Sequence, residues 1–425
     1  MIWISLLGLA LCLNFLLLAP GPRVSGFVAV SLLMAGHTQA LTFGPSGYVV
    51  RALGLAVLIY AARESLAPQV EQTPGRRLVR AFAVVGIVPF LFAVINTGST
   101  TASGAALIFG VAVFALILVA QNAHAREIAE GAMAAASLAT MISLVLYLAA
   151  PGIALGGTRL RGIFANANTM GFVAATVVLS ILVRRVRFRP STIIALAPAL
   201  VALLLSGSRA PVGALAAAAL VIAAQALIQG SFRRVVLLLG MAATVGISIA
   251  IAGEDATDTL LRSGNSREEG TYYALHTAQW SWTSGVGYGQ SAIEIASTPL
   301  RWLAEVGIVA GVSVLIAYGV VIFMSVRNSA SATAVASFGI VSSLFEGWYF
   351  AGGSALFILH WLVLLASFGQ AKNPLHHRTA DPAEGSGLRL DGRNNPRLRR
   401  PILGTRQPRP RLGRRRHKPS SRIYT

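Results

Sequence analysis

The sequence predicts an all-α, polytopic membrane protein with about 11 to 13 transmembrane helices. Of its 425 residues, 55% are hydrophobic and only 12% are charged. Apolar runs such as 104–120 and 235–252 approach the roughly 20 residues that a helix needs to cross a bilayer. These runs are apolar on every side, whereas a helix at the surface of a soluble protein has one polar face. Helices are expected because backbone exposed to lipid must satisfy its own hydrogen bonds.

The candidate spans follow one another over residues 2–19, 25–41, 47–62, 78–96, 104–121, 132–150, 169–183, 191–206, 211–228, 235–252, 302–325, 333–350 and 353–370. The first lacks a basic leading region and a small-residue cleavage site, so a retained span is expected there and not a secretion signal. The second and third are short or polar, because they contain His37, Gln39 and Arg51. They are the reason that the expected number of spans is a range.

Basic loops set the expected orientation in the cell membrane. The loops around 63–80, 184–189 and 233–234 are rich in arginine and are assigned to the cytoplasm by the positive-inside rule. The opposite, extracytoplasmic face then receives the remaining connections: 97–103, 151–168, 206–210 and the long loop 253–301. We therefore expect a multispan domain over 1–370 and a separate tail over 371–425.

The tail 371–425 has 15 Lys and Arg against three Asp and Glu, and it is rich in Pro and Gly. We expect it to be disordered and cytoplasmic, close to anionic membrane lipids. Nucleic-acid binding is the alternative for such a tract, but no interleaved aromatic residues support it. Cys12 is the sole cysteine, which excludes an internal disulfide and the cysteine spacings of metal sites. No metal and no cofactor is expected.

Six arginines fall on the extracytoplasmic face against the topological bias: Arg159, Arg161, Arg209, Arg262, Arg267 and Arg301. Cations kept there suggest an anionic ligand, for which a lipid-linked phosphate is the natural candidate. Arginine presents a planar fork of donors that suits phosphate oxygens. In a cleft of low dielectric constant, such donors stabilise the charge that develops on a departing pyrophosphate. The alternative for Arg262 or Arg301 is an interfacial anchor.

Three motifs surround these arginines: 159–171 (RLRGIFANANTMG), 206–211 (SGSRAP) and 263–269 (SGNSREE), which is followed by 285–289 (GVGYG). In the first, Asn166 and Asn168 can hydrogen-bond sugar hydroxyls. His276 is a candidate general base, with a surface histidine bonded to its neighbours as the alternative.

Together with LRWLAEVGIVAG at 300–311, these motifs resemble the O-antigen ligase and polymerase superfamily of membrane glycosyltransferases. The resemblance covers about 155–312. It implies a multispan helical enzyme that works outside the cytoplasm on undecaprenyl-pyrophosphate-linked glycans and transfers them to a glycan or lipid acceptor. By motif position, it implies that Arg209 and Arg267 hold the pyrophosphate and that Arg161 lines the same cleft. The further candidate substrate-binding residues are Arg159, Asn166, Asn168 and Glu305.

One position departs from the pattern. The ligases carry a histidine shortly before the LAE motif, and residues 295–300 contain none. Either His276 or an acid such as Glu305 substitutes, or the chain does not perform the ligase reaction. Two other classes therefore stay open: a transporter or flippase of an anionic or lipid-linked substrate, and a noncatalytic protein of envelope assembly.

Overall fold

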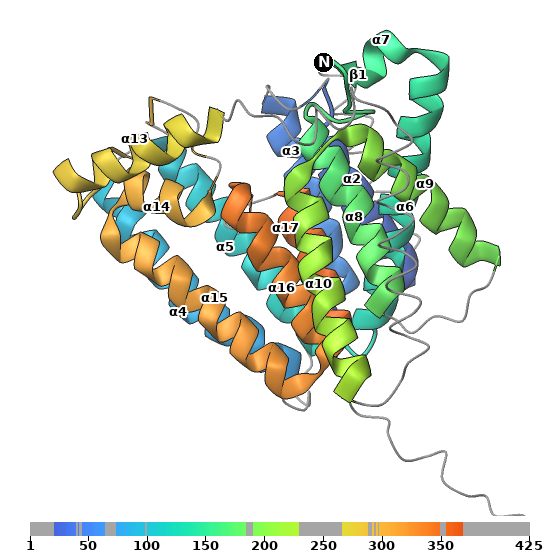
Figure 1. Ribbon diagram of the computed structural model, residues 1–425. Coiled ribbons are helices and arrows are strands. Elements are labelled where there is room, and N and C mark those ends of the chain that lie inside the picture. Colours follow the sequence, from blue (N-terminus) through green and yellow to red (C-terminus); the bar gives the residue numbers. More distant parts are fainter. Residues whose placement is uncertain are drawn as a thin grey trace, which may run out of the picture. The chain divides into compact units, whose positions relative to one another are not determined.

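The computed structural model is helical, with one two-stranded hairpin among the residues that it describes (Figure 1). Those residues are 21–39, 41, 45–63, 74–97, 100–183, 190–228, 266–287, 291–292, 295, 297–348 and 354–368. All of them belong to one compact unit, Met1–Asn373. The predicted spans 2–19 and 235–252 and the predicted tail 371–425 lie outside the described residues.

The helices before the hairpin are α2 (Pro22–Ala35), α3 (Pro45–Ala61), α4 (Pro74–Thr97), α5 (Thr100–Gln121), α6 (Ala125–Ala149) and the short α7 (Pro151–Ala154). After the strands β1 (Leu155–Gly156) and β2 (Arg159–Leu160) come α8 (Ala167–Val183), α9 (Pro190–Ser206), α10 (Arg209–Ile228), α13 (Ser266–Trp280), α14 (Thr298–Val306), α15 (Ile308–Asn328), α16 (Ala330–Phe345) and α17 (Ala355–Phe368). Proline opens several of these helices, where its missing N–H removes no intrahelical hydrogen bond.

Small residues let the first helices pack closely. Gly26 of α2 lies against the Ile128 carbonyl of α6, and Gly131 of α6 lies against the Arg23 carbonyl of α2, so that a Cβ at either glycine would clash with backbone. Close approach through small residues is typical of helix pairs in membranes, where packing and not water exclusion drives association.

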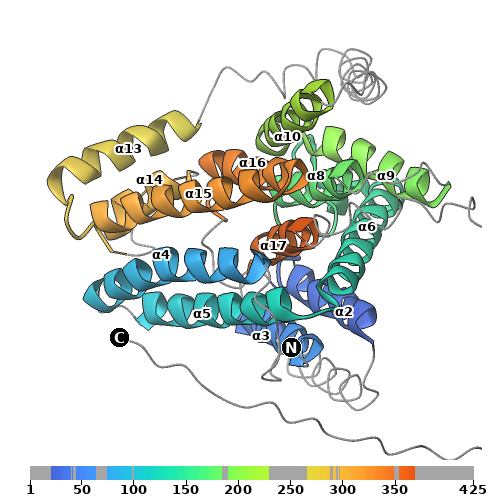
Figure 2. The same ribbon diagram turned by 90° about the horizontal axis from the view of Figure 1, so that it is seen from below.

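The core is built around α17, whose residues are all buried. The Trp361 ring lies 4.6 Å from that of Phe82 on α4, and the Phe357 ring lies 5.6 Å from that of Phe109 on α5. Figure 2 shows α17 enclosed by the helices around it. A helix that is apolar on every side is expected in such a position.

Hydrogen bonds between connections define two ends of the helices. Thr38, after α2, pairs with Phe164, before α8, and the Ala355 amide at the start of α17 donates to His37. We call this the motif end, because the first two arginine motifs lie there. At the opposite end, Ser331 of α16 donates to the Val183 carbonyl that ends α8.

Basic residues also gather at the opposite end: Arg23 beside the start of α6, Arg63 after α3, Arg126 at the start of α6 and Arg327 at the end of α15. Three described helices, α6, α10 and α15, are long and apolar enough to cross a membrane. The described chain is thus an all-α protein with candidate membrane spans, and a total of 11 to 13 remains a prediction.

The structure corrects the predicted boundaries of several spans. The predicted spans 25–41 and 333–350 run past the ends of their helices, because α2 ends at Ala35 and α16 ends at Phe345. Residues 302–325 are not one helix, because α14 ends at Val306 and α15 begins at Ile308. Gly307 between them has φ of 94°, a left-handed conformation that ends a helix and favours glycine. The predicted loop 253–301 likewise contains α13 and the first residues of α14.

Candidate functional site

The hairpin of β1 and β2 carries the first arginine of the site. Gly157 turns the chain with φ of 67°, which glycine adopts without a steric penalty. Leu160 is fully buried and anchors the hairpin, whereas Arg159 stays half-buried. The hairpin therefore fixes the backbone from which the Arg159 side chain reaches the neighbouring helices.

The Arg159 guanidinium joins the first motif to the second. Its Nε donates to the Ser206 carbonyl at 2.8 Å, and its Nη2 donates to Asn168 Oδ1 at 2.6 Å. Ser206 ends α9, so its carbonyl has no partner within that helix. A cation at this position also interacts favourably with the partial negative charge at the carboxyl-terminal end of the helix. Asn168 Oδ1 accepts a second bond, from the Ser208 hydroxyl, at 3.3 Å.

The Ser206–Ser208 turn is tightly built. Gly207 has φ of 55°, the Ser206 hydroxyl donates to the Leu203 carbonyl at 2.7 Å, and the Ser208 amide donates to Ser206 Oγ at 3.3 Å. Gly171 of α8 faces the turn, where an added Cβ would lie 2.6 Å from Ser206 Oγ. The turn is thus held against α8, and it fixes where α10 begins.

Arg209 is the first residue of α10 and is exposed. The amino-terminal end of a helix carries partial positive charge and unpaired amides, so an arginine at this position adds to a local field that attracts anions. Arg209 follows directly on the turn that Arg159 and Asn168 hold. The structure therefore brings the first two predicted motifs together.

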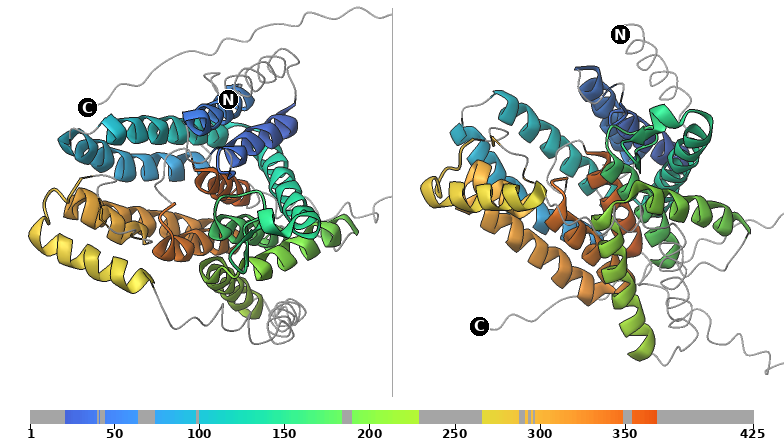
Figure 3. Two further views of the ribbon diagram at one scale, coloured as in Figure 1. Left: turned by 90° about the horizontal axis from the view of Figure 1, so that it is seen from above. Right: turned by 45° about the horizontal axis from the view of Figure 1, so that its top comes forward.

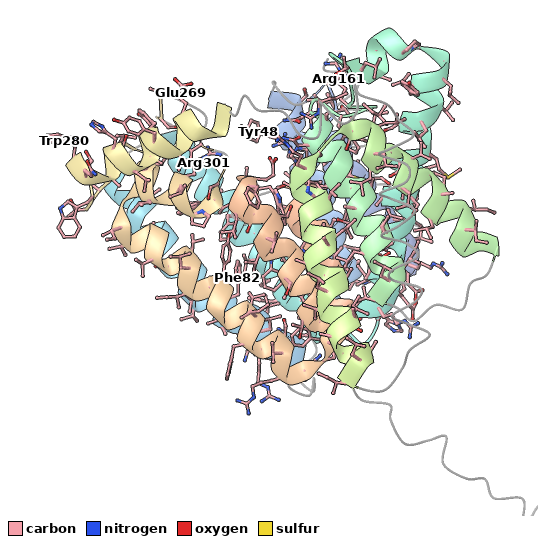
Figure 4. The ribbon with its side chains drawn as sticks, viewed as in Figure 1. Tyr48, Phe82, Arg161, Glu269, Trp280 and Arg301 are labelled. Carbon is pink, nitrogen blue, oxygen red and sulfur yellow. The ribbon has the colours of Figure 1, made fainter. Side chains whose placement is uncertain are left out.

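Arg161 lies on the same stretch of chain as Arg159 but has different partners. Its Nε donates to the Ile153 carbonyl at 3.3 Å, and its amide donates to the Ala154 carbonyl at 2.9 Å. Figure 4 shows Arg161 beside the hairpin, at the motif end. Its guanidinium is directed by the backbone of α7 and not by the Ser206–Ser208 turn.

The two asparagines of the first motif are engaged within the protein. Asn166 Oδ1 accepts the Asn168 amide at 2.7 Å, a bond that caps the start of α8. Asn168 Oδ1 accepts from Arg159 and Ser208, as described above. The structure therefore gives both oxygens a structural use that the prediction of sugar binding did not include.

Glu305 is buried at 1% exposure and belongs to a second group of residues. Its Oε1 accepts from Arg301 Nε at 3.1 Å and from the Ser291 hydroxyl at 3.0 Å. Residues 285–287 pack against the Glu305 backbone, where the Gly287 amide donates to the Glu305 carbonyl at 2.9 Å. Glycine at 285, with φ of 65°, lies against the same backbone. Gly285 and Gly287 therefore lie against the carboxyl-terminal end of α14.

His276 lies on the exposed face of α13. Its Nε2 accepts from Trp280 Nε1 at 3.3 Å, and its ring stacks on that of Tyr272 at 6.0 Å between centroids. The other face of α13 packs on α14, through Ala274 (Figure 3). These contacts match the alternative of a histidine bonded to its neighbours. Arg267 starts the same helix, but its side chain is outside the description, as is Arg262.

The turn between α2 and α3 is a part of the motif end that the sequence did not predict. The Ala165 amide donates to the His37 carbonyl at 3.1 Å. The Gln39 side chain donates to the carbonyls of Ile153 and Gly162 at 3.1 and 3.2 Å. The signal for this turn in the sequence is the pair of polar residues His37 and Gln39, which interrupt an apolar run.

Scans of the chain against protein-family models and against curated proteins find no match. Within the described ranges, no group of three or more His, Cys, Asp and Glu is arranged to hold a metal ion. The side chains that the structure brings together at the motif end are those of arginine, asparagine and serine, beside the ends of α9 and α10.

Proposed function

We propose that the chain is a membrane glycosyltransferase of the O-antigen ligase or polymerase type. It would transfer or polymerise a glycan carried on undecaprenyl pyrophosphate during the assembly of cell-surface polysaccharide. The observation that carries the proposal is the pair of Arg159 bonds, to Ser206 and to Asn168. These bonds connect two motifs that are separate in sequence, the first of which contains Arg161 and the second Arg209.

In the proposed reaction, an acceptor hydroxyl attacks the anomeric carbon of the lipid-linked glycan. The bond from that carbon to the diphosphate oxygen breaks, and its electron pair leaves with the diphosphate. Arginines fixed before the reaction stabilise this developing charge without having to reorganise. The hydroxyl proton goes to a base, for which His276 remains the prediction, although its Nε2 must first release the Trp280 indole.

The same proposal sets the orientation. Arg23, Arg63, Arg126 and Arg327 at the opposite end are assigned to the cytoplasm. The motif end then faces the outer leaflet, where a lipid-linked glycan can enter from the side. Membrane lipids and the glycan carrier are the expected partners.

The test is depletion of the protein, followed by complementation. Depletion should make the lipid-linked glycan accumulate, as measured by mass spectrometry, while surface polymer falls. Arg209→Ala and Arg161→Ala should fail to restore the polymer at unchanged protein level. Arg126→Ala is the matched control, because Arg126 is 69% exposed at the opposite end and pairs with Glu130.

Normal polymer in both motif-end variants would refute the proposal. A carrier would behave differently in proteoliposomes: it would move the lipid-linked glycan across the bilayer and leave the glycan unchanged. Flux of that kind without transfer would assign the chain to the transporter class.

A further inference from the structure

Arg51 is a half-buried cation in an otherwise apolar helix, α3. Its Nε and Nη2 both donate to the Gly36 carbonyl, at 3.1 and 2.7 Å, and its guanidinium carbon lies 5.3 Å from the centre of the Tyr48 ring. No carboxylate of the described residues forms an ion pair with it. Partial burial of a cation is unfavourable unless an anion compensates its charge.

The contacts of Arg51 tie it to the first arginine motif. A Cβ at Gly36 would lie 2.5 Å from Arg51 Cγ. The Arg51 side chain therefore occupies space that a side chain at position 36 would need. Farther along the same turn, Gln39 donates to the Ile153 carbonyl. Arg161 Nε donates to that same carbonyl. One backbone oxygen thus links the turn that Arg51 holds to the guanidinium of Arg161.

We infer that Arg51 is a further phosphate-binding residue at the motif end, and that its ligand is the phosphate or diphosphate group of the glycan carrier. The inference rests on the proposed function for the identity of that ligand. Tyr48 and Arg161 lie at the same end of the helices in Figure 4. With Arg159, Arg161 and Arg209, Arg51 is a fourth guanidinium among the described residues of this end, and such a group of cations complements a diphosphate in charge. Two of the five N–H donors of Arg51 bond to the Gly36 carbonyl. These two bonds fix the orientation of the guanidinium and leave its other three N–H groups for a ligand.

Arg63, two residues after the end of α3, provides a control. Like Arg51, Arg63 has its guanidinium over the ring of the tyrosine three residues earlier, 4.0 Å from the Tyr60 ring centre. Its Nη1 also donates to the Tyr60 carbonyl at 3.1 Å. It lies at the opposite end of α3, away from the motifs. Arg51→Gln and Arg63→Gln therefore remove the same charge beside a tyrosine, but Arg63 is exposed whereas Arg51 is half-buried.

The full chain in nanodiscs is titrated with two probes, inorganic pyrophosphate and undecaprenyl pyrophosphate, and binding is followed by calorimetry. Arg51→Gln should weaken binding about tenfold, which is the scale of one charged hydrogen bond. Arg51→Lys should weaken it less, since it keeps the charge and loses the fork. Arg63→Gln should match the wild type. The melting temperature without ligand serves as the folding control for all variants.

Unchanged affinity in Arg51→Gln, with Arg209→Ala weakened, would overturn the role of Arg51 and leave the proposed function standing. Binding of neither probe by the wild type would overturn both. If inorganic pyrophosphate binds in an Arg51-dependent manner and the lipid does not, the anion site stands but the carrier as its ligand is refuted. If melting falls equally in the Gln and Lys variants while affinity is unchanged, Arg51 only braces the turn.

Discussion

Replacing Arg159 and Asn168 by alanine, singly and together, measures the bond on which the proposed site depends. The bond is 2.6 Å long, involves one charged partner and joins two half-buried side chains. A hydrogen bond to a charged group contributes about 1.5–3 kcal/mol. Because solvent reaches both partners, we expect a coupling energy near the lower limit, about 1.5 kcal/mol. The free energies of unfolding are measured by denaturant titration in detergent micelles, followed by circular dichroism.

The control is a second cycle with Arg126 and Glu130, whose bond of 3.2 Å joins residues four apart on α6. Arg126 is 69% exposed, so this coupling should be about 0.3–0.5 kcal/mol. If the Arg159 and Asn168 substitutions are additive within about 0.3 kcal/mol, the bond does not couple the two motifs. That result would refute the preassembly of the site through this bond.

Four further substitutions, one of them a control, test the packing around the Ser206–Ser208 turn and around the end of α14. Gly171→Ala should destabilise the protein by about 1–3 kcal/mol through overpacking against the Ser206–Ser208 turn, whereas Gly213→Ala on α10, with open space around it, should be neutral or stabilising in the same unfolding assay. Gly307→Ala should cost more than about 1 kcal/mol, because φ is 94° and the Thr283 carbonyl occupies the Cβ position; equal melting temperatures would contradict the assigned break between α14 and α15. Glu305→Ala should destabilise the protein by about 1–3 kcal/mol by stranding its two donors, while pyrophosphate affinity stays unchanged if Glu305 has only this structural role.

Local sequence patterns predicted several of the described helices, but not α13, which lies in the predicted loop 253–301. Apolar runs bounded by proline or polar residues gave α8, α9 and α10 within about two residues of their observed limits. The same patterns failed at Gly307, because the residues on both sides of it are apolar and hydropathy does not reveal a residue with positive φ. A glycine within a predicted span can be a packing position or a break, and only the conformation distinguishes them.

The meeting of the first two motifs was expected only from the family likeness, and the structure supplies its physical basis. Arg159 was predicted as a secondary ligand residue, yet its bonds to Ser206 and Asn168 make it the link between the motifs. Such a contact spans 47 residues of chain, and composition or periodicity carries no information about it. The third motif is untested, because the side chain of Arg267 lies outside the described residues.

Both ends of the helices carry arginines, so charge alone does not distinguish the proposed site from a cytoplasmic face. The difference lies in how the guanidinium groups are held. At the opposite end, Arg63 and Arg126 are exposed and contact residues only three or four positions away in the chain. At the motif end, Arg51 and Arg159 reach carbonyls 15 and 47 residues away. A carbonyl oxygen carries no net charge, so the bonds to Gly36 orient the Arg51 guanidinium without neutralising it. The retained charge is what an anionic ligand requires.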